Sequence, residues 1–137
     1  MAEAAGDRAI AEGEKEAFHR AAEARIQTFQ YRKPTDTGAV KQFAPLIRSD
    51  LVRLSVQIVK EGGENNLHYH TGGDNCWMVL RGGARFYGVG DKLIADLGPN
   101  DGILLPGGSR YWFEKTGDED LEIEIPKYTI NMVSENH

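Results

Sequence analysis

The sequence predicts an all-β domain, an antiparallel sandwich or small barrel, with one helix ahead of it. After residue 34, short apolar runs recur about every 8–12 residues between glycine-rich turns, a pattern typical of such folds. In one run, Leu54, Val56 and Ile58 alternate with polar residues, as in a strand with one buried face. At 137 residues the chain is long enough for one domain with a real hydrophobic core.

The N-terminal extension, residues 1–34, is rich in alanine, and we predict a helix over about residues 14–29. Its apolar residues recur at offsets of four, four and three, which place them on one side of a helix: Phe18, Ala22, Ile26 and Phe29. A turn cluster at 34–38 separates this helix from the predicted barrel at 35–137. We interpret the helix as a lid or an arm that packs on the barrel or on a partner subunit.

The expected strands of the barrel follow in order at 53–58, 76–80, 84–87, 92–97, 102–105, 110–113 and 121–125. Gly62 and Gly63 end the first of these runs, and 81–83 makes a bend between the second and third. In the last run, leucine and isoleucine alternate with Glu122 and Glu124, which predicts one buried and one solvated face.

The His68-Tyr69-His70 segment is the main candidate for chemistry. Residues i and i+2 of an extended chain point to the same face, so the two imidazoles project side by side. That arrangement suits metal binding or proton transfer, and the chain has only four histidines.

Charge and composition exclude several other classes of function. The net charge of -5 gives no electrostatic basis for binding nucleic acid or an anionic membrane. The one cysteine, Cys76, excludes an intrachain disulfide and fits a reducing compartment. The first residues lack the basic start and apolar run of a signal peptide, and no run approaches the roughly 18 apolar residues of a membrane span. We therefore expect a cytoplasmic protein.

Two segments resemble the paired motifs of the cupin superfamily. The first cupin motif is a glycine, five residues, His-x-His, three or four residues, Glu, six residues and Gly, and this chain has Gly62, His68, His70, Asn75 and Gly82 at those spacings. The second contains a Pro-x-Gly turn, which the chain matches at 106–108. The resemblance covers about residues 40 to 126. It implies a cupin-type antiparallel β-barrel (jelly roll), here with an N-terminal helix.

The chain departs from the cupin pattern at ligand positions. Cupins with a complete site offer three histidines and one glutamate to a divalent metal. Here Asn75 stands at the glutamate position and Tyr111 at the third histidine position. Asn100 and Lys115 replace the first glycine and the closing asparagine of the second motif. The resemblance therefore implies a divalent transition metal (Zn, Fe, Ni, Cu or Mn) held weakly by His68 and His70, with Tyr111 or Asn75 as a further contact, or no metal at all.

Three functions follow as alternatives. The leading one is a cupin enzyme that acts on a small organic molecule with such a metal, as a dioxygenase, isomerase or lyase. The second is a metal-free isomerase, similar to epimerase-like cupins, in which His68 or His70 is the base, Tyr111 is the acid, and Asp74 is the nearest carboxylate. The third is a cupin that binds a small molecule without catalysis.

Alternation along the strands predicts the lining of the pocket. Asn75 and Trp77 share one inner face and Tyr111 and Phe113 another, and Arg85 would bind a carboxylate or phosphate if it faces inward. Cys76 should face the other way, as a packing residue. The outward side chains of 78, 80 and 112 are too apolar for a solvated sheet and need a cover. The helix could supply it in the same subunit or in a partner, and the resemblance implies a homodimer.

Overall fold

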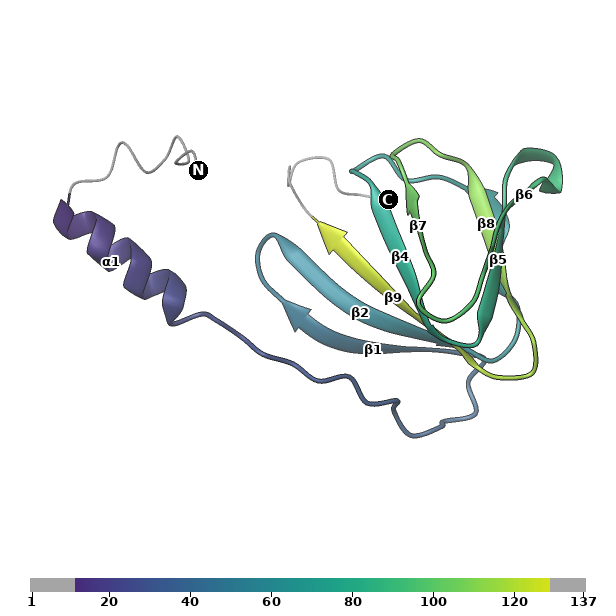
Figure 1. Cartoon of the computed structure of the whole chain (residues 1–137), viewed down its shortest axis with the longest axis horizontal. Coiled ribbons are helices and arrows are strands. Elements are labelled where there is room, and N and C mark those ends of the chain that lie inside the picture. Colours follow the sequence, from purple (N-terminus) through teal and green to yellow (C-terminus); the bar gives the residue numbers. More distant parts are fainter. Residues whose placement is uncertain (1–11, 129–137) are drawn as a thin grey trace.

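Two antiparallel sheets packed face to face form the body of the protein (Figure 1). The computed structural model describes residues 12–128. Its elements are α1 (Glu12–Glu23), β1 (Lys41–Arg48), β2 (Val52–Val59), β3 (Gly63–His68), β4 (Asn75–Arg81), β5 (Gly83–Tyr87), the 3₁₀ turn η2 (Val89–Asp91), β6 (Leu93–Leu97), β7 (Gly102–Leu105), β8 (Tyr111–Thr116) and β9 (Leu121–Tyr128).

The strand order is that of a jelly roll. One sheet runs β1-β2-β9-β4-β7 and the other runs β3-β8-β5-β6, and every pairing is antiparallel. Consecutive strands β2 and β3 lie in different sheets and are joined by residues 60–62, so the two sheets meet at this corner. The expected all-β, cupin-type fold with an N-terminal helix is confirmed.

The core lies between the sheets and is largely aromatic. Trp77 and Val79 of β4 are buried, whereas Cys76 and Met78 between them are exposed. The ring of Trp77 lies 5.3 Å from that of Phe113 between centroids, and Phe86 stacks on Phe113 at 5.1 Å. Alternation along the strand therefore identifies the inner face of β4 correctly. Burial of the apolar side chains on that face stabilises the fold.

A strap of the chain, residues 31–36, ties the N-terminal extension to the outside of the barrel. Tyr31 donates a hydrogen bond from its hydroxyl to Glu122 Oε1 at 2.6 Å. Lys33 pairs with Asp120 at 2.8 Å, and Asp36 pairs with Lys60. Glu122 points outward from β9 and is buried beneath this strap.

The helix differs from its prediction in length and in packing. It ends at Glu23 rather than near residue 29, and Gln27 beyond it donates to the carbonyl of Arg48 at 3.4 Å, which holds this stretch against the β1–β2 turn instead. Figure 1 shows α1 standing away from the barrel, and Phe18 and Ile26 are exposed. The helix therefore does not cover the outer sheet face within this subunit. The homodimer stays a prediction.

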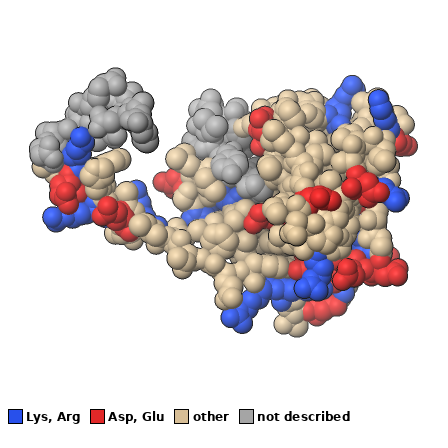
Figure 2. Space-filling model, in the orientation of Figure 1, with Lys and Arg blue, Asp and Glu red and all other residues tan. Residues whose placement is uncertain are grey.

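Acidic and basic side chains are interspersed over helix and barrel on the face shown in Figure 2, so no large patch of one charge forms there. None of the helices within residues 12–128 has the length and apolarity to cross a membrane.

Candidate functional site

The histidine segment lies where β3 ends and is held by a neighbouring turn. His68 is the last residue of β3, and His70 follows in the connection to β4. The carbonyl of His70 accepts a hydrogen bond from the backbone N–H of Gly108 at 2.8 Å. The carboxylate of Asp74 accepts another from the N–H of Gly107 at 2.9 Å. Asp74 therefore fixes the Pro-x-Gly turn and is not the carboxylate partner of a histidine that the sequence suggested.

Both imidazoles lie beside the phenol of Tyr111, as the sequence predicts. His68 and Tyr111 are directly opposite in the β3–β8 pairing, and their ring centroids are 4.4 Å apart. The Tyr111 hydroxyl lies 3.2 Å from His70 Nε2. The two imidazoles are 5.3 Å apart between centroids. Strand pairing thus gathers residues from two motifs into one cluster.

Glu64 joins this cluster, although the sequence analysis did not select it. Its Oε1 lies 3.0 Å from His68 Nε2, and His68 Nδ1 lies 2.7 Å from the carbonyl of Asn66. A carbonyl can only accept, so Nδ1 carries a proton. The Glu64 oxygen is close enough for a hydrogen bond but has none, because the contact is not aligned as one. The His68 ring is therefore held at Nδ1, with a negative charge beside Nε2.

Tyr111 remains protonated in this setting. Its side chain is buried, and burial raises the pKa of the phenol well above the ordinary value of 10.0, because the charged form loses its hydration. The charge of Glu64 raises that pKa further. Tyr111 is therefore a hydrogen-bond donor at neutral pH rather than a phenolate.

A hollow of about 460 Å³ opens beside the histidines. It is lined by Lys41, Glu64, Asn65, Asn66, His68 and His70. Both His68 and Glu64 keep 30% of their side chains exposed there, so a small molecule in the hollow can contact them. The hollow thus offers imidazole and carboxylate groups, with the phenol of Tyr111 buried behind the histidines, and these groups suit proton transfer.

The other predicted site residues fall into two groups. Trp77 and Phe113 are buried behind Tyr111 and pack the interior, with Trp77 and Tyr111 6.2 Å apart between ring centroids. Asn75 is half-buried and begins β4 on the same face as Trp77. Arg85 does not reach the site, because it is exposed on the outer face of β5 and pairs with Asp96 at 3.2 Å.

The donor set does not make a complete metal site. No group of three or more His, Cys, Asp or Glu side chains that could hold a metal converges among residues 12–128. Catalytic zinc sites generally use three protein ligands, and a protonated phenol is a poor substitute for one. His68 and His70 are thus the two side chains that would hold a cation, with Asn75 where cupins have a glutamate.

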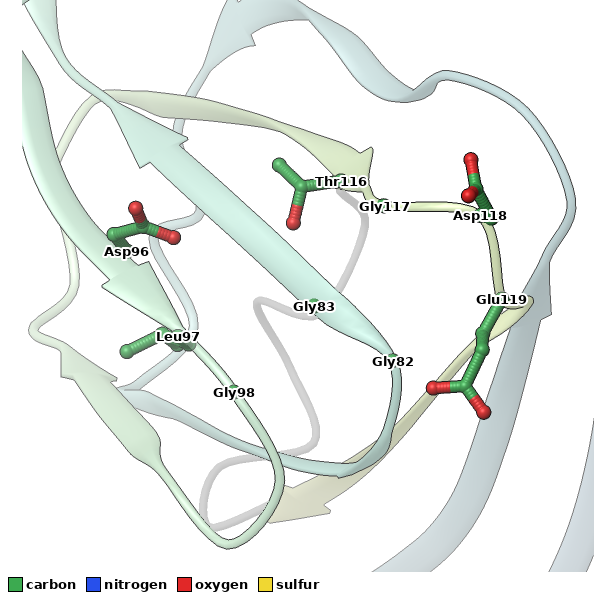
Figure 3. A pocket seen from close by; sticks show the side chains of 9 residues that line it. All are labelled: Gly82, Gly83, Asp96, Leu97, Gly98, Thr116, Gly117, Asp118 and Glu119. Atoms are coloured by element: carbon green, nitrogen blue, oxygen red, sulfur yellow. The ribbon is translucent and has the colours of Figure 1, made fainter.

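A second hollow lies at the opposite end of the barrel, among the β4–β5, β6–β7 and β8–β9 turns (Figure 3). Its side chains include Asp96, Thr116, Asp118 and Glu119, with glycines between them. Asp96 is engaged by Arg85, and no histidine lines the hollow. This end of the barrel is separate from the cluster of His68, His70 and Tyr111.

Residues 55–129 match the family model described as a cupin domain. The match covers more than half of the 137 residues, so the chain belongs to the cupin family. This confirms the resemblance drawn from the two sequence motifs.

The individual proteins that resemble this chain either match less than half of its length or are under 20% identical to it. A 2Fe-2S ferredoxin from Pseudomonas aeruginosa is 39% identical over 62 residues, which make up 45% of this chain and 55% of that protein. The chain thus spans about half the length of the curated relative it matches. The cupin domain of Cnp3 from Schizosaccharomyces pombe has a TM-score of 0.60 at 16% identity, over 73% of this chain and 68% of that one. A putative mannose-6-phosphate isomerase from Ralstonia eutropha JMP134 has a TM-score of 0.54 at 19% identity, over 65% and 83%. At such identities the solved structures support the fold.

Proposed function

We propose that this cupin is an enzyme that acts on a small organic molecule by proton transfer, as an isomerase or lyase. The observation that carries the proposal is the arrangement around His68. Its Nδ1 is held by the Asn66 carbonyl, Glu64 lies beside its Nε2, and the protonated Tyr111 lies against its ring. A base, a charge that stabilises its protonated form and a neutral donor are the parts that such chemistry needs.

The proposed step is abstraction of a proton from a carbon next to a carbonyl group. The C–H bond breaks, the proton moves to His68 Nε2, and the electron pair moves onto the carbonyl oxygen. Glu64, 3.0 Å from Nε2, stabilises the imidazolium that forms. The His70–Tyr111 pair, joined at 3.2 Å, provides the donor for the developing oxyanion. Return of the proton to another atom completes an isomerisation.

Solvent exchange tests this proposal without the natural substrate. The protein is incubated in D2O with 2-oxobutanoate, 2-keto-D-gluconate and D-fructose, and loss of the C–H signal next to the carbonyl is followed by proton NMR. We expect exchange with at least one compound, and a loss of about 100-fold or more in His68→Gln and Tyr111→Phe. Tyr69→Phe is the matched control, because Tyr69 is exposed. Equal exchange in His68→Gln and wild type would refute the assignment.

A metal-dependent enzyme is the second candidate, favoured by the 5.3 Å separation of the two imidazoles at the family's ligand positions. In that case purified protein contains transition metal near stoichiometry, and His68→Ala together with His70→Ala removes it. Activity that survives chelation supports proton transfer without metal. Binding of a small molecule with no exchange and no metal supports the third alternative, a non-catalytic cupin.

The cofactor in the name of the Pseudomonas relative does not extend to this chain. Fe–S clusters are held mainly by cysteine thiolates, four of them in the common [2Fe–2S] sites. This chain has one cysteine, Cys76, which is exposed on the outer face of β4. We therefore do not assign iron–sulfur chemistry to it.

A further inference from the structure

Within the part of the chain that the structure describes, α1 has no surface to pack on. Figure 1 shows it standing away from the barrel, and none of the side chains at 13–23 is buried. Isolated helices shorter than about 12–15 residues are marginal in water, because the first turn is costly to form and few hydrogen bonds follow it. α1 has 12 residues and an internal ion pair between Glu16 and Arg20, so it needs a packing partner.

One side of α1 is apolar and ends in a positive charge. Phe18 is 51% exposed, and Ala22 lies one turn further along the same side of the helix. Arg25 comes three residues later, in the turn that follows the helix, and is exposed. It makes no ion pair with a described residue. This side of the helix therefore needs an apolar surface that carries a negative charge.

A surface of that kind lies on the outer face of the five-stranded sheet, where β4 pairs with the edge strand β7. Cys76 and Leu104 are directly opposite in this pairing, and Met78 follows Cys76 on the same face. All three side chains are exposed, Leu104 by 59%, so the strap at residues 31–36 leaves them uncovered. We call these three residues the β4–β7 patch. An apolar patch on the outside of a sheet is a candidate contact surface.

Glu124 supplies the negative charge beside the β4–β7 patch. It is opposite Met78 in the pairing of β9 with β4, so both side chains lie on the outer face. Glu124, like Arg25, makes no ion pair with a described residue. The patch and the apolar side of α1 thus complement each other in polarity and in charge.

These two surfaces do not meet within one subunit. Gln27, just after the helix, donates to the carbonyl of Arg48 where β1 ends. β1 and β7 are the opposite edges of the sheet, four strand spacings or roughly 19 Å apart. From the β1 edge, α1 leads away from the barrel (Figure 1). A second copy related by a two-fold axis presents both surfaces, and a single kind of contact made twice then satisfies both helices.

We propose that α1 of each subunit packs on the β4–β7 patch of a second copy, in a reciprocal exchange of arms. The apolar side of the helix covers Cys76, Met78 and Leu104, and Arg25 lies near Glu124. This assigns surfaces to the predicted homodimer, and it does not rest on the proposed function.

Disulfide trapping tests the contact directly, because Cys76 is the one cysteine of the chain. Ala22→Cys places a second thiol on the apolar side of α1, and two thiols form a disulfide only where their Cα atoms come within about 7 Å. The full-length variant is oxidised mildly and run on a non-reducing gel. We expect at least about tenfold more covalent dimer than in Arg20→Cys, whose thiol lies on the opposite side of the helix.

The pattern of products decides between the possible contacts. Adding Cys76→Ser to Ala22→Cys should abolish the covalent dimer, and a dimer that persists joins two introduced thiols and contradicts the proposal. A bond that closes within one chain would show that α1 folds back on its own barrel. A ladder of larger products would show an open chain of subunits in place of a reciprocal pair. Equal yields from Ala22→Cys and Arg20→Cys would also overturn the proposal.

Sedimentation velocity of the full chain gives an independent readout. We expect a dimer whose dissociation constant rises at least about tenfold in Phe18→Asp and in Leu104→Lys, because each places a charge in an apolar contact. Leu93→Lys is the matched control, since Leu93 is exposed on β6 in the other sheet. A wild-type monomer would show that the patch serves a different partner. A dimer that neither variant weakens would show that the subunits meet through another surface.

Discussion

At the scale of single residues, Gly63 lets the paired strands β3 and β8 of one sheet approach closely beside the site. It begins β3 opposite Glu114 of β8, and a Cβ atom added there would lie 2.3 Å from the carbonyl oxygen of Phe113. That distance is far inside van der Waals contact, and the oxygen belongs to the backbone of β8, so it cannot move without shifting the strand. Glu64 and Tyr111, on these two strands, depend on this close approach.

We predict that Gly63→Ala lowers the free energy of unfolding by roughly 1–3 kcal/mol, the usual cost of forcing a methyl group into a packed interior. Urea denaturation followed by circular dichroism measures it. Gly13→Ala is the control, because a Cβ at Gly13 in α1 meets nothing within 4 Å and alanine favours the helix. Equal stability of Gly63→Ala and wild type would show that the two strands separate easily.

Residue types and spacing predicted part of the site, and the reason for the rest is local. His68, His70 and Tyr111 meet as expected because motif spacing places them on paired strands. Glu64 was missed, although it lies an even number of residues before His68. The pairing of β3 with β8 shifts between Glu64 and His68, so simple counting does not establish that both face inward. Arg85 was a candidate for binding a substrate, but the structure places it on the outer face of β5. Its neighbours in the sequence do not reveal that it pairs there with Asp96.

At the scale of elements, the strap at residues 31–36 covers the outward side chain of Glu122 on β9. The outward side chain of Glu122 on β9 is buried, and it is partnered by the Tyr31 hydroxyl at 2.6 Å and by Arg81 at 3.4 Å. Helical periodicity in the extension indicated that a helix is present, but the helix ends at Glu23, so Ile26 and Phe29 of the predicted apolar stripe lie beyond it. The strap carries no periodic signal, since its contacts are made by single polar side chains.

Tyr31→Phe should reduce the free energy of unfolding by roughly 1.5–3 kcal/mol, the range for a hydrogen bond to a charged group. The ring is kept, so packing is unchanged and the loss isolates the bond to Glu122. Tyr69→Phe provides the matched comparison, because Tyr69 is exposed and makes no described hydrogen bond. Thermal or urea unfolding of the three proteins decides it. Indistinguishable curves would mean that the strap does not hold Glu122 in solution.

At the scale of the whole molecule, a buried phenol and a half-buried phenol lie on opposite faces of the barrel wall. Tyr111 is inside and Tyr31 is outside, and the pKa of each hydroxyl is raised above the ordinary 10.0, chiefly by burial. In both cases a carboxylate adds to the effect, Glu64 for Tyr111 and Glu122 for Tyr31. The folded state therefore retains protons that the unfolded chain releases in alkali, and this links stability to pH.

We predict that the protein loses stability steeply above about pH 10, the ordinary phenol value. Below that pH both states carry the phenol protons, so these groups add no slope. Above it the unfolded chain binds fewer protons than the folded one, and the free energy of unfolding falls by up to about 1.4 kcal/mol per pH unit for each phenol. Half-buried Tyr31 contributes less, because solvent screens its charge.

Urea unfolding at a series of pH values from 8 upward measures the slope. It should be shallower in Tyr31→Phe, and shallower again when Tyr111→Phe is added. Tyr69→Phe should keep the wild-type slope, and a double variant that also keeps it would show that these two phenols ionise freely in the folded protein.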